Sequence, residues 1–164
     1  MRNNARSVNS SLLLAILDQG FKRKAWHGPN LRQALRGVSA KEAAWRPARG
    51  RHNIWEIALH AAYWKYVVRR RLIGGKRGSF VLAGSNWFEC PGPDATGKDE
   101  AWRRDLALLE NEHRLLRDAV VRYLAGQNHR ALLAQIFGVA FHDVYHAGQI
   151  RLLRRVQSKT PRLA

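Results

Sequence analysis

The stretch 138-GVAFHDVYHAGQI-150 carries two histidines, His142 and His146, four residues apart among mainly apolar neighbours. In an α-helix this spacing places both imidazoles on one face, one turn apart. Two side chains so placed can share a cation, but a metal site in a protein uses three or four ligands. The stretch therefore predicts a helix that carries part of a metal site, and the third ligand has to come from elsewhere in the chain.

Helical periodicity extends from this stretch to most of the chain. Apolar residues recur every three or four positions in four long segments, which is typical of helices that share a core. The segments are 11–26, 54–73, about 102–123 and about 131–156, with shorter amphipathic pieces at 31–38 and 39–45. No segment shows the alternating pattern of a strand. We therefore expect an all-α fold, a four-helix bundle that forms a single domain over residues 1–164.

The sequence also predicts where several helices begin and end, and one long loop between two of them. Ser39 with Glu42, and Asn53 with Glu56, match the capping-box pattern at a helix start. The second long helix is predicted to stop at the glycine pair 74–75, and residues 74–98 form a crossover loop before the third. We expect Trp87 and its neighbour Phe88 to pack back from this loop onto the helices.

The charge of the chain is strongly positive. It contains 29 Lys+Arg against 12 Asp+Glu, a formal net charge of +17. Such a surface attracts anions, including nucleic acid, acidic metabolites and acidic proteins, although the chain has no zinc-finger or RNP signature. An arginine-rich solvated surface with no specific partner is the simpler interpretation. The lone Cys90, the lack of an apolar run long enough for a membrane span, and an N-terminus unlike a signal peptide lead us to expect a cytoplasmic protein.

Five histidines remain as candidates for the third ligand. His60 lies inside the most apolar helix, where an imidazole without a partner would cost about 1–3 kcal/mol, so it is the best candidate. His27 and His113 stay open as alternatives, while His52 and His129 are weaker because they lie at helix starts or in loops. His113 can equally be a buried residue of the helix seam. His27 can structure its loop or act as an acid or base at a pocket mouth.

The segments 59-LHAAYW-64 and 142-HDVYHAGQI-150 resemble those of the DinB/YfiT-like family of metal-binding four-helix bundles. The resemblance extends over nearly the whole chain and includes the helix order and the long crossover. It implies that His60, His142 and His146 hold a divalent cation, zinc or nickel among the candidates, with water completing the coordination shell. Neutral imidazoles suit these ions, and three ligands leave coordination positions open.

Other residues can support such a site. Metal-bound histidines need acceptors for their second nitrogen, and Glu56 and Gln149 lie one turn from His60 and His146. Asp143 is less suited, because adjacent helical positions do not face one another. We expect the pocket wall to include aromatic side chains, and arginines at 69–71 or 151 to hold an acidic substrate. The substrate-binding candidates are Trp64, Trp87, Tyr145 and Arg151.

The resemblance implies two kinds of enzyme, thiol S-transferases that use bacillithiol or a similar thiol and mycothiol-dependent maleylpyruvate isomerases. The expected function is therefore a metal-dependent enzyme, a thiol S-transferase or hydrolase-like, acting on a small anionic substrate. A water or a low-molecular-weight thiolate on the metal would be the nucleophile. The alternative is a non-catalytic basic protein with a structural metal, which binds nucleic acid or an acidic partner. A homodimer through the apolar face of the second long helix is compatible with both.

Overall fold

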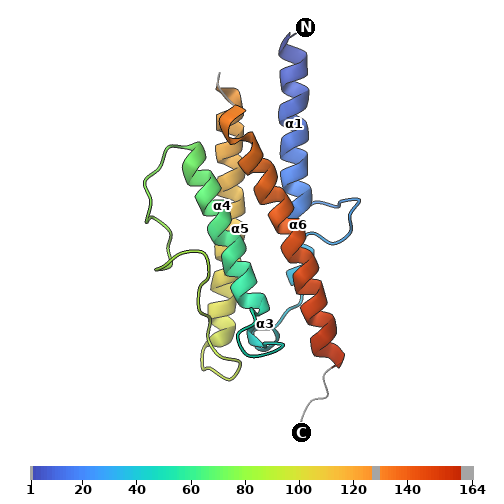
Figure 1. Ribbon diagram of the computed structural model, residues 1–164, viewed down its shortest axis with the longest axis vertical. Helices are drawn as coiled ribbons and strands as arrows, with labels where there is room; N and C mark the ends of the chain where they lie inside the picture. The colour runs from blue at the N-terminus through green and yellow to red at the C-terminus, as the bar shows by residue number, and fades with distance from the viewer. Residues whose placement is uncertain (1, 127–129, 160–164) are drawn as a thin grey trace.

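The computed structural model describes residues 2–126 and 130–159, and every regular element in these ranges is an α-helix. The prediction of an all-α chain is therefore confirmed. Figure 1 shows four long helices side by side, with α4 and α5 running in one direction and α1 and α6 in the other. The helices are α1 (Arg2–Phe21), α2 (Leu31–Leu35), α3 (Ala40–Ala44), α4 (Ile54–Leu72), α5 (Lys98–Ala125) and α6 (Arg130–Lys159). His129 lies outside the described residues.

Helix α4 is the most enclosed element of the fold. Its N-terminus is fixed by a capping box, in which the side chain of Asn53 accepts a hydrogen bond from the Glu56 amide, and Asn53 Nδ2 also donates to the carbonyl of Ala44 at the end of α3. Most of its residues from Ile54 to Val68 are buried, against α5, α6 and the segment 80–88. The apolar face of α4 is thus covered by other parts of the chain, and the homodimer that we expected through this face stays a prediction that would need another surface.

The boundaries of the first helix differ from the prediction. Helix α1 begins at Arg2, before the apolar pattern starts, and ends at Phe21 rather than at residue 26. The residues that follow do not pack on the core, since Lys22, Arg23 and Lys24 are exposed and Trp26 is fully exposed. Instead the amides of Lys22 and Arg23 both turn back to the Asp18 carbonyl at 2.8 Å. Residues 2–10 are mainly polar in sequence, so this part of the helix leaves no periodic apolar signal.

Helices α4 and α5 are joined by residues 73–97, which run back along the molecule from the end of α4 to the start of α5 (Figure 1). Phe88 returns from this segment to the core and is 6 % exposed, as expected. Two buried or half-buried polar contacts hold the helix pair in register. Trp55 Nε1 donates to Asp105 at 2.8 Å, and Arg69 binds both carboxylate oxygens of Glu112.

Helix α6 packs against both α1 and α4. Its approach to α1 is close at Gly20, where an added Cβ would lie 2.7 Å from the carbonyl oxygen of Ala140. Its contact with α4 includes an ion pair between Lys65 and Asp143, both fully buried. Helix α6 is thereby fixed against the face of α4 that carries His60. Among the described helices, not one combines the length and apolar content that crossing a bilayer requires.

Candidate metal centre

The structure brings His60 from α4 together with His142 and His146 from α6. One ligand atom of each residue can be chosen so that all three lie within 4.8 Å of one another. The Nε2 atom of His142 is 3.0 Å from the Nε2 atoms of both His60 and His146. Of the described residues, these three form the one group of histidine, cysteine or acidic side chains with such convergence. Their role as metal ligands stays a prediction, but the third position named from the sequence is the one the fold supplies.

The second nitrogens of two of these rings have acceptors. His60 Nδ1 lies 2.8 Å from the carbonyl oxygen of Asn86, and His146 Nδ1 lies 2.6 Å from Oε1 of Gln149. Each Nδ1 therefore carries the proton and donates, which leaves the Nε2 lone pair free to face the centre of the cluster. His142 Nε2 is then the donor between two acceptors. Its Nδ1 is buried without a hydrogen-bond partner among the described residues.

Burial keeps these imidazoles neutral at physiological pH. It lowers the pKa of His142 to about 3, helped by the neighbouring His146 and His60, and the pKa of His146 to about 4, although the hydrogen bond that His146 donates to Gln149 opposes this shift. Burial also lowers the pKa of His60. A neutral imidazole is the form that ligates a metal, so the cluster does not have to lose charge before it accepts a cation.

The donor set fits a divalent cation of borderline softness. Two imidazole nitrogens at 2.0–2.1 Å from a tetrahedral zinc ion lie about 3.3 Å apart. The two measured separations of 3.0 Å are within a few tenths of an ångström of that value. The unpartnered Nδ1 of His142 is the second nitrogen of its ring, and it would carry the proton when Nε2 ligates the cation. Three nitrogen ligands would leave at least one coordination position open.

The crossover segment contributes the acceptor for His60. Asn86 is the one described non-glycine residue with positive φ, at 67°, a conformation that asparagine tolerates better than most residues. Its carbonyl accepts from His60, while its side-chain Oδ1 accepts from Trp64 Nε1 at 3.0 Å. Two contacts from one residue thus fix the loop to α4. The neighbouring Trp87 stacks on the His60 ring with centroids 3.9 Å apart.

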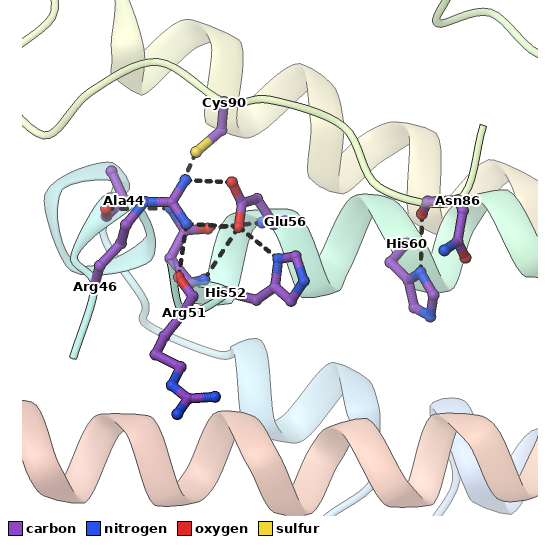
Figure 2. A network of polar contacts seen from close by, with 9 residues as sticks. Ala44, Arg46, Arg51, His52, Glu56, His60, Asn86 and Cys90 are labelled. Atoms are coloured by element: carbon purple, nitrogen blue, oxygen red, sulfur yellow. Dashed lines mark hydrogen bonds and ion pairs between the residues drawn. The ribbon is translucent and has the colours of Figure 1, made fainter. Parts of the chain in front are cut away.

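The prediction that Glu56 supports His60 is wrong. Figure 2 shows the Glu56 carboxylate facing Arg46 and His52, whereas His60 reaches Asn86 in another part of the view. Glu56 occupies the third position of α4, where its carboxylate also approaches the amide of Asn53. Burial alone would raise the pKa of Glu56, but the hydrogen bonds from Arg46 and His52 hold it below its usual value. The Glu56 carboxylate is bound to Arg46 and lies close to the Asn53 amide at the helix cap, so it is not directed toward His60.

The alternative histidines lie elsewhere. His27 is exposed in the segment between α1 and α2. His113 is 1 % exposed in α5, stacked on Phe21 with centroids 4.0 Å apart, and its Nε2 is 3.4 Å from Asp18. Neither belongs to the group that could hold a metal. The geometry of His113 matches the buried seam residue that we offered as its other interpretation.

The predicted substrate-binding residues divide into two groups. Trp64, Trp87 and Tyr145 border the cluster, with Tyr145 64 % exposed and its ring centroid 5.2 Å from that of His146. The arginines are not gathered there. Arg69 is bound to Glu112, and Arg151 is exposed on α6 without an ion pair to a described residue. The structure therefore gives no support to arginines at 69–71 or 151 as anchors for an anionic substrate.

The roles of three residues around the site were not predicted from the sequence. Asn86 is hidden because its role depends on loop backbone, although an asparagine between Ser85 and an aromatic pair is a plausible turn signal. Lys65 and Asp143 were the more visible omission, since a lysine in an apolar helix needs a buried partner. The same reasoning could have predicted that Lys65 on α4 pairs with Asp143, the acidic residue next to His142 on α6.

Two cavities in the described part of the chain are lined by residues other than the three histidines. The larger, of about 530 Å³, is lined by residues that include Phe21, Arg32 and Leu109. The smaller, of about 230 Å³, borders Arg46 and Cys90. A metal site is defined by converging ligand atoms rather than by volume, so the histidine cluster is the stronger candidate for chemistry.

Comparison with models of known protein families identifies a match. A family model described as the DinB superfamily matches residues 25–150, which include His60, His142 and His146. No curated protein and no solved structure matches the chain.

Proposed function

The chain belongs to the DinB superfamily, and from this premise we propose that it binds one divalent cation through His60, His142 and His146. The observation that carries the proposal is the convergence of three neutral imidazoles, with His142 Nε2 3.0 Å from the other two Nε2 atoms. Uncharged nitrogen donors favour zinc, nickel and similar ions over magnesium or calcium, which prefer oxygen.

We further propose that the centre is catalytic rather than structural. Structural zinc sites are closed by four protein ligands, whereas catalytic sites keep an open position. A cation held here would act as a Lewis acid that lowers the pKa of a thiol or water at that position. The reaction class that follows is thiol S-transfer or a hydrolase-like reaction on a small anionic molecule. A low-molecular-weight thiol is the proposed co-substrate in the first case.

The residues of the chain would have separate tasks in this reaction. Asn86 and Gln149 accept from the Nδ1 atoms of two ligands and so keep their Nε2 lone pairs directed inward. Trp64 and Tyr145 border the cluster and offer aromatic surface to a substrate. The net charge of +17 would draw an anion toward the protein as a whole.

The wider expectations belong to the same proposal. The four long helices would form a four-helix bundle of one domain over 1–164, with residues 73–97 as its crossover. The protein would act in the cytoplasm. A homodimer would have to use a surface other than α4, and α6 exposes Phe141, Tyr145 and Leu152.

A thiol-transfer assay tests the catalytic proposal. Metal-free and zinc- or nickel-loaded protein are incubated with glutathione, bacillithiol or mycothiol and an electrophilic dye, and with nitrophenyl esters for hydrolysis. We expect turnover only in the loaded protein, and its loss in His142→Ala. Equal rates with and without metal for every substrate would refute a catalytic centre.

A second candidate function rests on the net charge of +17. In that case the metal is structural and the basic surface binds nucleic acid. Binding to mixed-sequence duplex DNA would then weaken steeply between 50 and 200 mM salt. Absence of binding at low salt would remove this candidate, and would leave the catalytic proposal unaffected.

A further inference from the structure

Trp87 lies between two histidine rings, and only one of them belongs to the metal centre. Its ring is stacked on that of His60 with centroids 3.9 Å apart and an interplanar angle of 10°. It is also stacked on that of His52, with centroids 3.6 Å apart and an angle of 8°. The three rings form a nearly parallel stack that runs from a residue just before α4 to a predicted metal ligand.

The outer end of this stack is itself fixed. His52 Nδ1 lies 3.0 Å from Oε2 of Glu56, and both carboxylate oxygens of Glu56 are bound by Arg46 (Figure 2). Arg46 also donates to the carbonyl of Arg51 at 2.7 Å. Although His52 is 46 % exposed, its ring is therefore held in one orientation by a charge-assisted network.

The inner end of the stack needs such a support. The single hydrogen bond from His60 Nδ1 to the Asn86 carbonyl sets the direction of that nitrogen but leaves the plane of the ring free to tilt about it. A small tilt moves Nε2, on the far side of the ring, away from His142. A flat aromatic surface 3.9 Å away restricts the tilt, and Trp64 restricts it from the side at a centroid distance of 6.3 Å.

We propose that Trp87 and His52 are positioning residues for His60, with the Trp87 ring, held between the two imidazoles, keeping His60 Nε2 directed at His142. This inference rests on the proposed function, in which His60 is a metal ligand. It reassigns Trp87 from a substrate contact to part of the support of the centre. His52 acts through Trp87, and Glu56 and Arg46 act through His52.

The inference predicts a graded loss of metal affinity. Removal of a group that orients a ligand typically weakens metal binding 10- to 100-fold. We expect this range for Trp87→Ala and a smaller loss, of about threefold to tenfold, for His52→Ala. Trp87→Phe and His52→Phe keep an aromatic ring in the stack and should retain most of the affinity, although His52→Phe deletes the bond to Glu56.

Competition of each variant with a chelating dye for zinc measures these affinities. Trp26→Ala, which alters a fully exposed tryptophan, is the matched control and should equal the wild type. Circular dichroism and urea unfolding show whether each variant is folded. If Trp87→Ala does not fold, His52→Ala decides the outcome, because its exposed side chain can be removed without opening the core. Wild-type affinity in the folded alanine variants would overturn the inference.

A measurement on metal-free protein separates this inference from the proposed function. Nitrogen-15 NMR of the imidazoles should show His60 in the wild type as one tautomer, protonated at Nδ1. In Trp87→Ala and His52→Ala we expect mixed tautomers or broadened signals, and recovery in the phenylalanine variants. If the wild type binds no zinc, the proposed function fails, and these spectra still decide the positioning role. An unchanged His60 signal in both alanine variants would contradict it.

Discussion

Two polar clusters lie next to each other between α4 and α6, and they differ in the kinds of side chain that they bring together. In one, Lys65 and Asp143 carry opposite charges, are both fully buried, and form an ion pair. In the other, His60, His142 and His146 are three donors of the same kind that face one another. Asp143 is the direct neighbour of His142, so the two clusters share one turn of α6.

The difference indicates which buried polar group stabilises the fold and which is suited to bind a ligand. An ion pair supplies both partners from the chain, and removal of either partner leaves an unpaired buried charge. Three neutral imidazoles supply no charge to balance and cannot all donate to one another. A cation at the centre would bind the Nε2 lone pairs of all three rings, with the proton of His142 then on its Nδ1. Like groups that converge therefore indicate a binding site, whereas unlike groups indicate structure.

The largest expected effect comes from a substitution that breaks the ion pair between Lys65 and Asp143. Lys65→Met leaves the Asp143 carboxylate buried without its partner, which should lower the free energy of unfolding by about 3–5 kcal/mol. Urea unfolding of metal-free protein measures the change. The double variant Lys65→Met/Asp143→Leu removes both charges and should recover most of the loss. A double variant as unstable as the single one would show that the pair contributes more than charge balance.

The next effect is stabilisation by zinc, which should depend on the histidine cluster and not on the ion pair. Zinc at 100 times its dissociation constant should stabilise the wild type by about 2.7 kcal/mol. His142→Ala should lose this stabilisation, while the metal-free variant remains folded, because its neighbours do not depend on it for charge balance. Thermal unfolding with and without zinc gives the comparison. Stabilisation of His142→Ala by the full wild-type amount would place the metal elsewhere.

A third effect concerns a histidine in neither cluster. Burial, with the charges of Lys65, Lys22 and Arg117, lowers the pKa of His113 to about 2, although the Asp18 carboxylate is 3.4 Å away. The unfolded chain takes up a proton near pH 6.5 while the folded chain does not, so stability is complete above that pH and is lost as the pH falls toward 2.

A difference of one bound proton between the unfolded and folded chains changes the free energy of unfolding by at most about 1.4 kcal/mol per pH unit. His113→Gln should therefore lose less stability than the wild type when metal-free protein is taken from pH 6.5 to 5.0. Urea midpoints at several pH values measure both slopes. Parallel slopes would mean that His113 is protonated equally in the folded and unfolded chains.

The smallest effect tests an acceptor beside a ligand. Gln149→Ala removes the partner of His146 Nδ1 and should weaken zinc binding about tenfold, or about 1.4 kcal/mol. Gln149→Glu keeps an acceptor and should retain the affinity. Chelator competition distinguishes them, and equal weakening in both variants would show that the contact does not orient the ring.

The helices and the histidine cluster could be predicted because their signals are local. The four-residue spacing of His142 and His146 fixes their shared face whatever surrounds them. A polar ring within an apolar helix made His60 the best third candidate, and the family resemblance selected it over His27 and His113. Glu56 shows the limit of the same argument, because its spacing from His60 is right but the cap at Asn53 engages it first. That competing signal was already visible in the capping-box pattern.

The remainder of the site depends on contacts between distant parts of the chain. The Asn86 carbonyl reaches His60 because the crossover adopts a left-handed backbone at that residue, which no periodicity reveals. Trp87 was expected to pack inward, but its place between His52 and His60 requires the path of the whole loop. Lys65 and Asp143 are 78 residues apart, and their pairing depends on how α6 lies against α4.

The most direct test is the metal content of the purified protein beside His60→Ala, His142→Ala and His146→Ala. We expect one zinc or nickel ion per chain in the wild type by elemental analysis, and its loss in each of the three variants. Trp26→Ala should keep the ion. Full metal content in His60→Ala, or a wild type that takes up no divalent ion when it is supplied, would contradict the assignment of the three histidines as a metal centre.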